Sequence, residues 1–370
     1  MVDLLISAKL TNRLPIAFFF LLTLLISSSV LAYIITTTIS ARAQTDDTLL
    51  PQIYEKSIRS IVLITVNIMI QGQPGIARGS GFVYDNSGHI ITNNHVVEGG
   101  GDTVDVKFID GNSYSAKVIG RDRYSDLAVL QVDPAVLTTE QAMPLPLGSS
   151  SAMKIGQHVI SIGNPLGRYA GTMTEGIISQ ENLMILNPTG EFFEVGMIQF
   201  DAPITHGNSG GPLLNLNNQV IGVASASSEL ATFIAFAIPS DTVKRVVPQL
   251  IMDGTYQHPW LGIGGLDITS DIAQALGLRQ ANGIIVTDVT QGSPAALAGI
   301  TSGTRMVGTI GNQTINSDAD IILGVDKLRV RGLSDLLTYI DTKSVGDSVT
   351  LSGIRNGVSG TTTVHLAARP

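Results

Sequence analysis

A glycine-rich segment near the middle of the chain places a serine where nucleophilic chemistry would need it. The segment is Gly207-Asn208-Ser209-Gly210-Gly211-Pro212. A serine nucleophile needs its hydroxyl at a tight turn, with backbone N–H groups directed at the developing oxyanion. Glycines on both sides allow the φ values that such a turn demands. The same residues could form an ordinary β-turn, so this segment alone does not decide the chemistry.

A histidine and an acid each stand next to an apolar run earlier in the chain. His95 follows the apolar run that begins at Ile90, and the other five of the six histidines lack this setting. Asp126 immediately precedes another apolar run, where a carboxylate can hold an imidazole in one tautomer. Asp122 and Asp133 are rival acids nearby, although solvated loop carboxylates would be their ordinary role. The order histidine, acid, serine is that of the chymotrypsin fold, whereas subtilisins and α/β-hydrolases use other orders.

The elements that would hold these residues are predicted to be short strands. Between Ile53 and about Leu250, closely spaced apolar runs are separated by Gly, Asn and Asp, which favours an antiparallel barrel or sandwich over βαβ units. The runs are Ile61–Ile70, Ser80–Tyr84, His89–Thr92, Val104–Ile109, Ala128–Val132, Val159–Ile162 and Val220–Ala224. Thr242–Met252 has helical spacing, but Pro248 is expected to disrupt its second half.

The bulk composition excludes several classes of function. A formal charge of −8, without any basic cluster, argues against nucleic-acid binding, which needs a basic face. The chain has no cysteine, which removes disulfides, thiolate metal sites and cysteine nucleophiles. The sequence contains neither a metal-binding cluster nor a phosphate-binding loop, so no cofactor is predicted.

A long apolar segment stands near the N-terminus. Residues 15–36 carry no charge, and about 20 apolar residues are enough to span a bilayer. Lys9 and Arg13 precede this segment, which predicts that 1–14 are cytoplasmic and that the rest is exported. The prediction is therefore a single-pass cell-membrane protein with extracytoplasmic domains. The alternative is a signal peptide cleaved near Ala41-Arg42-Ala43, which would give a secreted or periplasmic protein.

Five blocks of sequence occur in the order found in one known family. GSGFVYDNSGHIITNNHVV, SDLAVLQV, SIGNPLG, DAPITHGNSGGPLLN and FAIPS closely resemble the trypsin-like protease domain of the HtrA (Deg) family, through most of residues 53–250. The resemblance implies a mainly β fold with a chymotrypsin-like double β-barrel. It also implies His95 as general base, Asp126 as its orienting partner and Ser209 as nucleophile. The backbone N–H groups of Gly207 and Ser209 would form the oxyanion hole.

Other residues near this predicted site also allow expectations. His206 departs from the family pattern, in which proline or another residue precedes the serine turn, and a solvent-facing side chain is expected for it. Pro203 stands where the fold builds the base of its primary pocket, and Ala224–Ala226 and Phe236–Ile238 are small or apolar, so a small aliphatic P1 residue is expected. Residues 179–196 are predicted to form a regulatory loop.

The C-terminal residues 258–370 resemble the PDZ module, an α+β domain, that HtrA proteases carry. The resemblance rests on Trp260-Leu261-Gly262-Ile263 and on the later GIIVTDVTQGSPAALAGI. Such a module accepts an extended peptide as an added strand, and backbone N–H groups of the Trp260–Ile263 loop would hold the peptide's terminal carboxylate. Two short helices are predicted, Ile272–Leu276 and Leu333–Thr342, and the second would form the wall of the groove. Residues 303–319 are predicted to form an additional hairpin.

Two functions from different classes fit these patterns. The first is an endopeptidase for unfolded or damaged exported proteins, whose PDZ domain binds peptide C-termini; the resemblance implies a homotrimer, and no nucleic-acid partner is expected. The second is a catalytically quiet, chaperone-like binding module. The intact set of His95, Asp126 and Ser209 favours the first. The predicted organisation is a cytoplasmic N-terminus at 1–14, an anchor at 15–36, a linker at 37–52, a protease domain at 53–252 and a PDZ domain at 258–370.

Overall fold

The computed structural model describes residues 48–370, except 71, 142, 188–190 and 228–232. Contacts divide the chain into two units, Met1–Lys56 and Ser57–Pro370. In the first unit residues 48–56 are helical, and this helix includes the end of the predicted linker at 37–52. The apolar residues Leu50 and Ile53 have helical spacing. The predicted anchor at 15–36 lies outside the described residues. Among the helices that are described, none is long and apolar enough to cross a membrane.

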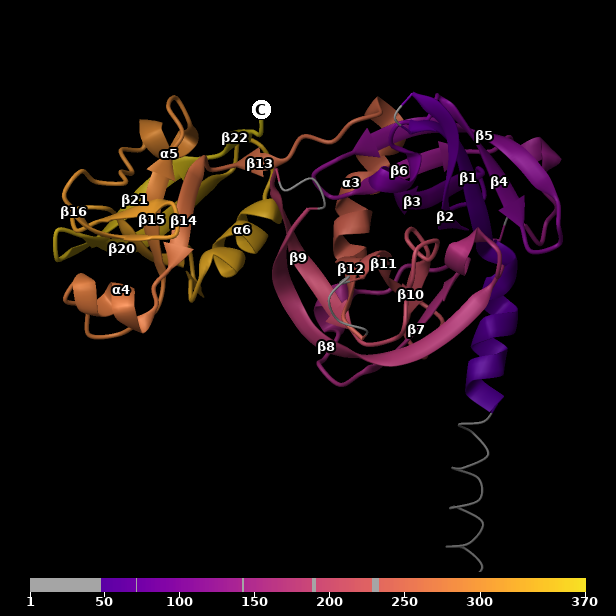
Figure 1. Ribbon diagram of the computed structural model, residues 1–370, viewed down its shortest axis with the longest axis horizontal. Helices are drawn as coiled ribbons and strands as arrows, with labels where there is room; N and C mark the ends of the chain where they lie inside the picture. Colours follow the sequence, from indigo (N-terminus) through magenta and orange to yellow (C-terminus); the bar gives the residue numbers. More distant parts are fainter. Residues whose placement is uncertain (1–47, 71, 142, 188–190, 228–232) are drawn as a thin grey trace, which may run out of the picture. The chain divides into compact units, whose positions relative to one another are not determined.

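Six antiparallel strands form the first closed barrel of the second unit, in the order β1-β2-β3-β6-β5-β4 (Figure 1). They are β1 (Ile61–Ile70), β2 (Gln73–Val83), β3 (His89–Asn93), β4 (Thr103–Phe108), β5 (Ser113–Asp122) and β6 (Leu127–Gln131). In β4 the inward positions Val104, Val106 and Phe108 are buried and the residues between them are exposed. This alternation is what a strand with one face on a barrel core requires.

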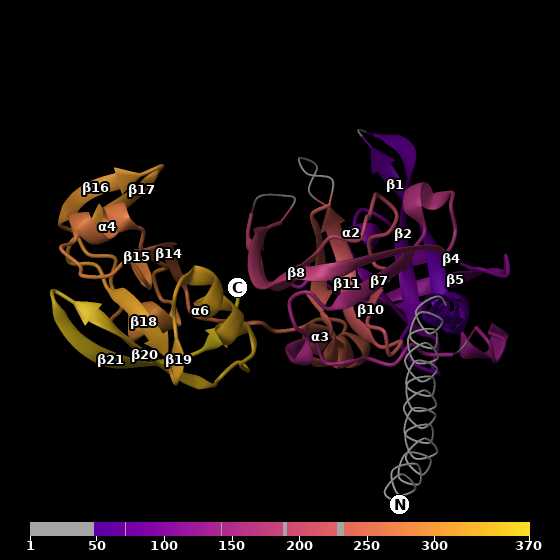
Figure 2. The same ribbon diagram turned by 90° about the horizontal axis from the view of Figure 1, so that it is seen from below.

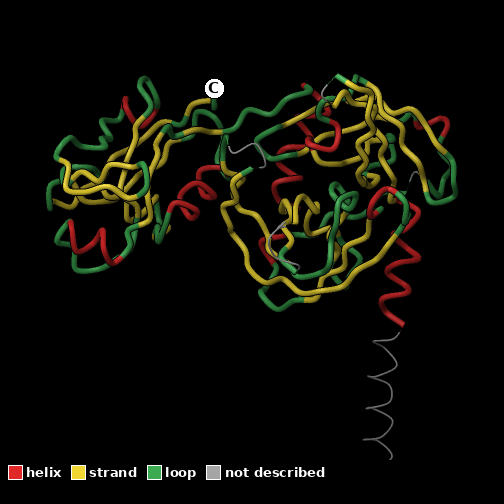
Figure 3. Tube along the Cα trace, in the orientation of Figure 1, coloured by secondary structure: helices red, strands yellow, loops and turns green. Residues whose placement is uncertain are grey.

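Six further strands close a second barrel, in the order β10-β11-β12-β9-β8-β7. They are β7 (His158–Gly163), β8 (Thr172–Leu186), β9 (Phe193–Phe200), β10 (Pro212–Leu214), β11 (Val220–Ser227) and β12 (Ala235–Pro239). The core includes Phe200, Leu213 and Ile178, all fully buried. The tube view in Figure 3 shows how strands dominate both barrels. The predicted chymotrypsin-like double barrel is confirmed.

Helix α3 (Ser240–Asp253) packs against β5 and β6 of the first barrel and against β11 and β12 of the second. The helix continues through Pro248, so the prediction that proline disrupts its second half is wrong. Val246, Val247 and Leu250 on its inner face are fully buried. Their packing offsets the one backbone hydrogen bond that proline cannot donate.

The C-terminal domain is built on a sheet with the path β14-β15-β18-β20-β21, and β19 pairs with β18. Its strands are β14 (Ile263–Asp267), β15 (Ile284–Val289), β18 (Ile321–Val325), β19 (Leu328–Arg329), β20 (Ser348–Arg355) and β21 (Val358–His365); β13 (Pro259–Trp260) pairs separately with β22 (Ala367–Ala368). The helices are α4 (Ser270–Ala275), α5 (Pro294–Leu297) and α6 (Leu333–Asp341). Leu336 and Ile340 of α6 are buried in the domain core. Both predicted helices are therefore present, and α5 is an additional one.

The predicted hairpin within 303–319 is also present, as β16 (Met306–Ile310) and β17 (Gln313–Asn316) (Figure 2). These strands form a two-stranded sheet of their own. Ile315 of β17 packs in one buried cluster with Ile272 and Ala273 of α4. The hairpin is thus anchored to the domain by an apolar contact.

Candidate active site

The register of β3 with β6 brings His95 and Asp126 together. In this antiparallel pair Asn93 lies opposite Leu127, so the chain that leaves β3 meets the chain that enters β6. His95 is carried by the short helix α2 (Asn94–Val97) that follows β3. Asp126 precedes β6 and has a left-handed backbone, with φ of 52°. Aspartate is one of the few side chains that adopt this conformation at small cost.

Asp126 holds His95 through both of its carboxylate oxygens. Oδ2 lies 2.7 Å from His95 Nδ1, and Oδ1 accepts a hydrogen bond of 2.9 Å from the His95 backbone N–H. Because the carboxylate can only accept, Nδ1 carries the proton and Nε2 remains free as a base. Partial burial lowers the pKa of His95, but the charge and hydrogen bond of Asp126 outweigh this and raise it above its ordinary value.

Ser209 lies in a turn whose glycines are structurally required. Gly207 and Gly210 have φ of 101° and 86°. A Cβ at Gly207 would overlap the carbonyl oxygen of Asn164, and one at Gly210 would overlap that of Ser80. The Ser209 Oγ donates a hydrogen bond of 2.8 Å to the Ser225 carbonyl. Within the described residues this hydroxyl makes no hydrogen bond to His95, so it must rotate before it can transfer its proton.

The backbone around the serine turn leaves two donors free. The His206 carbonyl accepts from Leu166 N–H at 2.7 Å, and the Gly207 carbonyl accepts from Ser80 Oγ at 2.7 Å. In the part of the chain that the structure covers, the N–H groups of Gly207 and Ser209 have no acceptor. Both donors remain available to a developing oxyanion. The His206 side chain is exposed, as expected.

Two residues whose contacts the sequence did not predict complete this neighbourhood. Ser225 Oγ donates a hydrogen bond of 2.9 Å to Asp126 Oδ2, which fixes the carboxylate from the second barrel. Glu194, on β9, is 7% exposed. Burial and the Asp126 carboxylate, against the attraction of His95, raise the pKa of Glu194 to about 8. Neither residue has a sequence signal, because their burial depends on how the two barrels close.

The segment predicted as a regulatory loop at 179–196 is largely strand. β8 extends to Leu186 and β9 begins at Phe193, and the two pair as a long antiparallel hairpin with repeated register shifts. The extension includes the continuous apolar run from Leu183 to Leu186. The prediction of a loop is therefore wrong for most of the segment.

The rival acids differ from one another in the structure. Asp133 is exposed and accepts a hydrogen bond from Ala135 N–H at the start of a 3₁₀ turn, so it is an ordinary capping residue. Asp122 is only 4% exposed. The expectation of a solvated carboxylate is wrong for Asp122, because it accepts hydrogen bonds from Tyr124 and Ser125 N–H and contacts His258.

A cavity of about 320 Å³ lies beside the Trp260–Ile263 segment in the C-terminal domain. Apolar residues of β14 and α6 line it, including Ile263, Leu333, Leu337 and Ile340. Within the described residues the N–H groups of Leu261 and Gly262 have no acceptor. Gly262 has φ of 81°, and a Cβ there would overlap Ser293. The groove therefore has an apolar wall and two unused donors at one end.

Segments outside β14 and α6 also reach this groove. Phe192 and Phe193, at the end of the β8–β9 hairpin, line the same cavity. Gln313 of the additional hairpin lines it as well. Among the described residues no group of three or more His, Cys, Asp or Glu side chains could hold a metal ion.

Comparisons with known proteins identify the same two kinds of domain. The chain matches the trypsin-like peptidase domain family over residues 79–223 and the PDZ domain family over residues 259–366. A DegP-like periplasmic serine endoprotease of Bartonella henselae is 38% identical over 298 residues, which are 80% of this chain and 54% of that protein. The chain therefore contains a trypsin-like peptidase domain followed by a PDZ domain. A DegP-like periplasmic serine endoprotease of Chlamydia trachomatis is likewise 38% identical, over 77% of this chain and 53% of that protein.

Solved protease structures cover the chain more completely. The HtrA-type protease AlgW with a tripeptide matches 86% of this chain and 96% of its own, with 28% identity and a TM-score of 0.67. The serine endoprotease from Yersinia pestis matches 86% of this chain and 98% of its own, with 26% identity and a TM-score of 0.59. By contrast, the chain spans about half the length of the curated relatives it matches.

Proposed function

We propose that this chain is a serine endopeptidase of the HtrA type, in which His95, Asp126 and Ser209 form the catalytic triad. The observation that carries the proposal is that the Asp126 carboxylate accepts hydrogen bonds from both the imidazole and the backbone N–H of His95. These two hydrogen bonds fix the tautomer in which Nε2 can accept a proton. Ser225, which donates to the same carboxylate, keeps it in place.

The proposed reaction follows from these positions. The Ser209 hydroxyl leaves the Ser225 carbonyl and gives its proton to His95 Nε2 while Oγ attacks the scissile carbonyl carbon. The N–H groups of Gly207 and Ser209 stabilise the oxyanion of the tetrahedral intermediate. His95 then donates the proton to the leaving amine, which breaks the C–N bond and leaves an acyl-enzyme. A water molecule, deprotonated by His95, hydrolyses this ester.

The proposed substrates are unfolded or damaged exported proteins, and the PDZ groove would bind peptide C-termini. The unused N–H groups of Leu261 and Gly262 and the apolar wall of α6 support carboxylate capture beside apolar side chains. Residues 15–36 would tether the extracytoplasmic domains to the membrane, and the family resemblance supports a homotrimer. Protease treatment of intact cells tests the topology, because a fully protected C-terminal domain would contradict it. Sedimentation of the purified protein tests the trimer.

A second candidate is a binding protein that does not cleave, or that cleaves only after activation. The observation that favours it is the hydrogen bond from Ser209 Oγ to the Ser225 carbonyl instead of to His95. Digestion of casein by the purified chain, compared with its Ser209→Ala variant, separates the two candidates. The peptidase proposal expects casein fragments from the parent only. Equal absence of fragments, with C-terminal peptide binding retained, would leave the binding function.

A further inference from the structure

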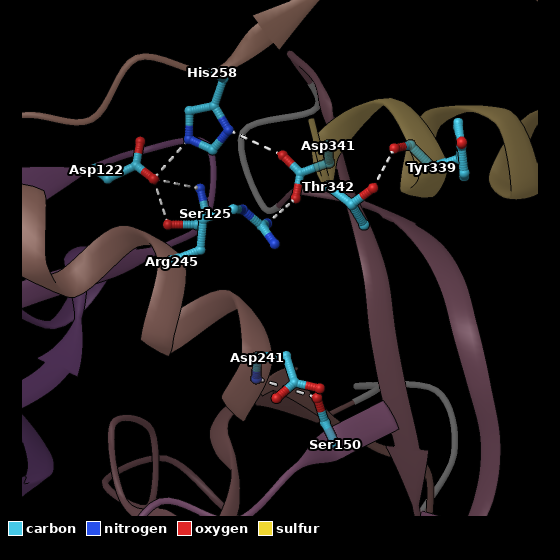
Figure 4. Close-up of polar contacts among 9 residues, drawn as sticks. All are labelled: Asp122, Ser125, Ser150, Asp241, Arg245, His258, Tyr339, Asp341 and Thr342. Carbon is cyan, nitrogen blue, oxygen red and sulfur yellow. Dashed lines mark hydrogen bonds and ion pairs between the residues drawn. The ribbon is translucent and has the colours of Figure 1, made fainter. Parts of the chain in front are cut away.

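His258 occupies a buried position between two carboxylates. It follows α3 and immediately precedes β13, and only 5% of it is exposed. Its Nε2 lies 2.8 Å from Asp122 Oδ2, and its Nδ1 lies 3.1 Å from Asp341 Oδ1 (Figure 4). An ionised carboxylate can accept but cannot donate, so both ring nitrogens must carry protons. The geometry therefore requires His258 to be a cation when both contacts are made.

The charges of His258 and its ion-paired neighbours balance one another. Arg245 of α3 pairs with Asp341, so two cations, His258 and Arg245, face two anions, Asp122 and Asp341. We call these four residues the His258 cluster. A buried ion is stable only where partners of opposite charge and hydrogen bonds compensate its lost hydration.

Further polar and charged groups surround the imidazole. The rings of Tyr124 and Tyr256 contact it edge-on, at centroid distances of 5.6 Å and 4.7 Å. Arg369 donates its backbone N–H to the His258 carbonyl, and its guanidinium lies 3.9 Å from the Tyr124 ring centroid. These contacts enclose the His258 ring, and none of them adds a negative charge.

Asp122 connects His258 to the proposed active site. Its Oδ1 accepts from Tyr124 N–H at 3.2 Å, and its Oδ2 accepts from Ser125 N–H at 3.2 Å and from the Ser125 hydroxyl. These bonds close the turn that leads directly into Asp126 and so hold the backbone that carries its carboxylate. The orientation of Asp126 therefore depends on a carboxylate that His258 holds.

We propose that His258 is a positioning residue for Asp126, and that it links the turn before Asp126 to the end of helix α6 through Asp341. The inference rests on the proposed serine-peptidase function. His258 contacts no reacting atom and acts only through Asp122. If His258 loses its proton, one ring nitrogen presents a lone pair to a carboxylate, and one of the two contacts breaks.

The pH at which this would happen follows from the same contacts. Burial lowers the pKa of His258, but the hydrogen bonds and charges of Asp122 and Asp341 outweigh burial and raise it to about 9. A pKa raised in the folded state gives stability that is complete below the ordinary value of 6.5 and is lost as pH rises through about 9. The turn before Asp126 should therefore loosen above pH 9.

The first test is the pH profile of kcat/KM, measured from pH 6 to 10 with a short peptide whose C-terminus is blocked. His258→Gln, which cannot become a cation, should lower kcat/KM at least about tenfold at pH 7 and should remove the decline of the parent above pH 9. His158→Gln is the matched control, because His158 also contacts one acid, Glu175, but on an exposed surface. It should keep the parental profile.

The outcomes separate the inference from the proposed function. A parent without activity at every pH would contradict the peptidase proposal itself. An active parent, together with a His258→Gln variant that keeps the parental kcat/KM and the same alkaline decline, would overturn the role of His258 alone.

A second measurement needs no variant and so cannot fail through misfolding. Nuclear magnetic resonance of the parent can follow the imidazole of His258 and the downfield Nδ1 proton of His95. We expect both signals to change together with an apparent pKa of about 9. A His258 that titrates near 6.5, or a His95 signal that does not respond while His258 titrates, would overturn the proposal.

Discussion

Asp126 combines a left-handed backbone with a carboxylate that accepts from His95 and from Ser225. Asp126→Asn should therefore keep the shape of the site and reverse the hydrogen-bonding of the imidazole. We expect kcat/KM on unfolded casein to fall about 10⁴-fold, because the histidine would adopt the wrong tautomer. Asp133→Asn, at an exposed capping residue, should change kcat/KM little. A loss of less than tenfold for Asp126→Asn would contradict the role of this carboxylate.

Glu194 allows a prediction about stability instead of rate. Its carboxyl is preferentially neutral in the folded protein, because its pKa is raised from 4.5 to about 8. The contribution of this carboxyl to the free energy of unfolding is therefore complete below pH 4.5 and is lost as pH rises through 8. Glu194→Gln should unfold in urea with the parental free energy at pH 4.5 but should be more stable above pH 8, by about 2–4 kcal/mol. Glu98→Gln, at an exposed site, should not show this difference. The prediction would be refuted if the free energy of unfolding changed with pH in the same way for Glu194→Gln and the parent.

Residue types and their order in the chain were enough to choose His95, Asp126 and Ser209 as candidates. The structure brings His95 and Asp126 into contact, whereas the hydroxyl of Ser209 faces the Ser225 carbonyl. Glu194 and the contacts of His258 could not be predicted. Each depends on burial between segments far apart in the sequence, which local composition does not encode.

The strands were predictable where apolar residues alternate or cluster over a buried face, as in β1 and β4. β8 was not, since much of it is partly exposed and its register with β9 shifts repeatedly. In helix α3 the proline at 248 predicted a disrupted helix, because proline lacks the backbone N–H. Tertiary packing nevertheless stabilises the helix through this residue. Element type followed from the sequence where apolar spacing was clear but not in the segment 179–196, and the extent of each element depended on its neighbours.

The turn between β13 and β14 allows a test of the peptide groove. Gly262→Ala should weaken binding of an apolar peptide with a free C-terminus by at least about tenfold, because the new Cβ overlaps Ser293 and the φ of 81° is strained for alanine. Gly360→Ala is the matched control, since a Cβ there has no neighbour within 4 Å. Calorimetric titration gives both affinities. An unchanged affinity for Gly262→Ala would show that this loop does not hold the carboxylate.

In the whole molecule, both barrels contribute to one proposed site. His95 and Asp126 come from the first barrel, whereas Ser209 and the supporting Ser225 come from the second. The site therefore depends on how the barrels meet, with α3 packed against strands of both. Because the three proposed triad residues must be held together in one site, we expect their contributions to kcat/KM to be non-additive.

The most direct test of the peptidase account is a kcat/KM series on an unfolded protein for Ser209→Ala, His95→Ala and the double variant, with folding checked by circular dichroism. Each single change should abolish nearly all turnover, and the double variant should lose little more, because triad residues are strongly non-additive. Peptide binding at the PDZ groove should survive in all three. A folded Ser209→Ala protein that still cleaves at near the parental rate would contradict the account.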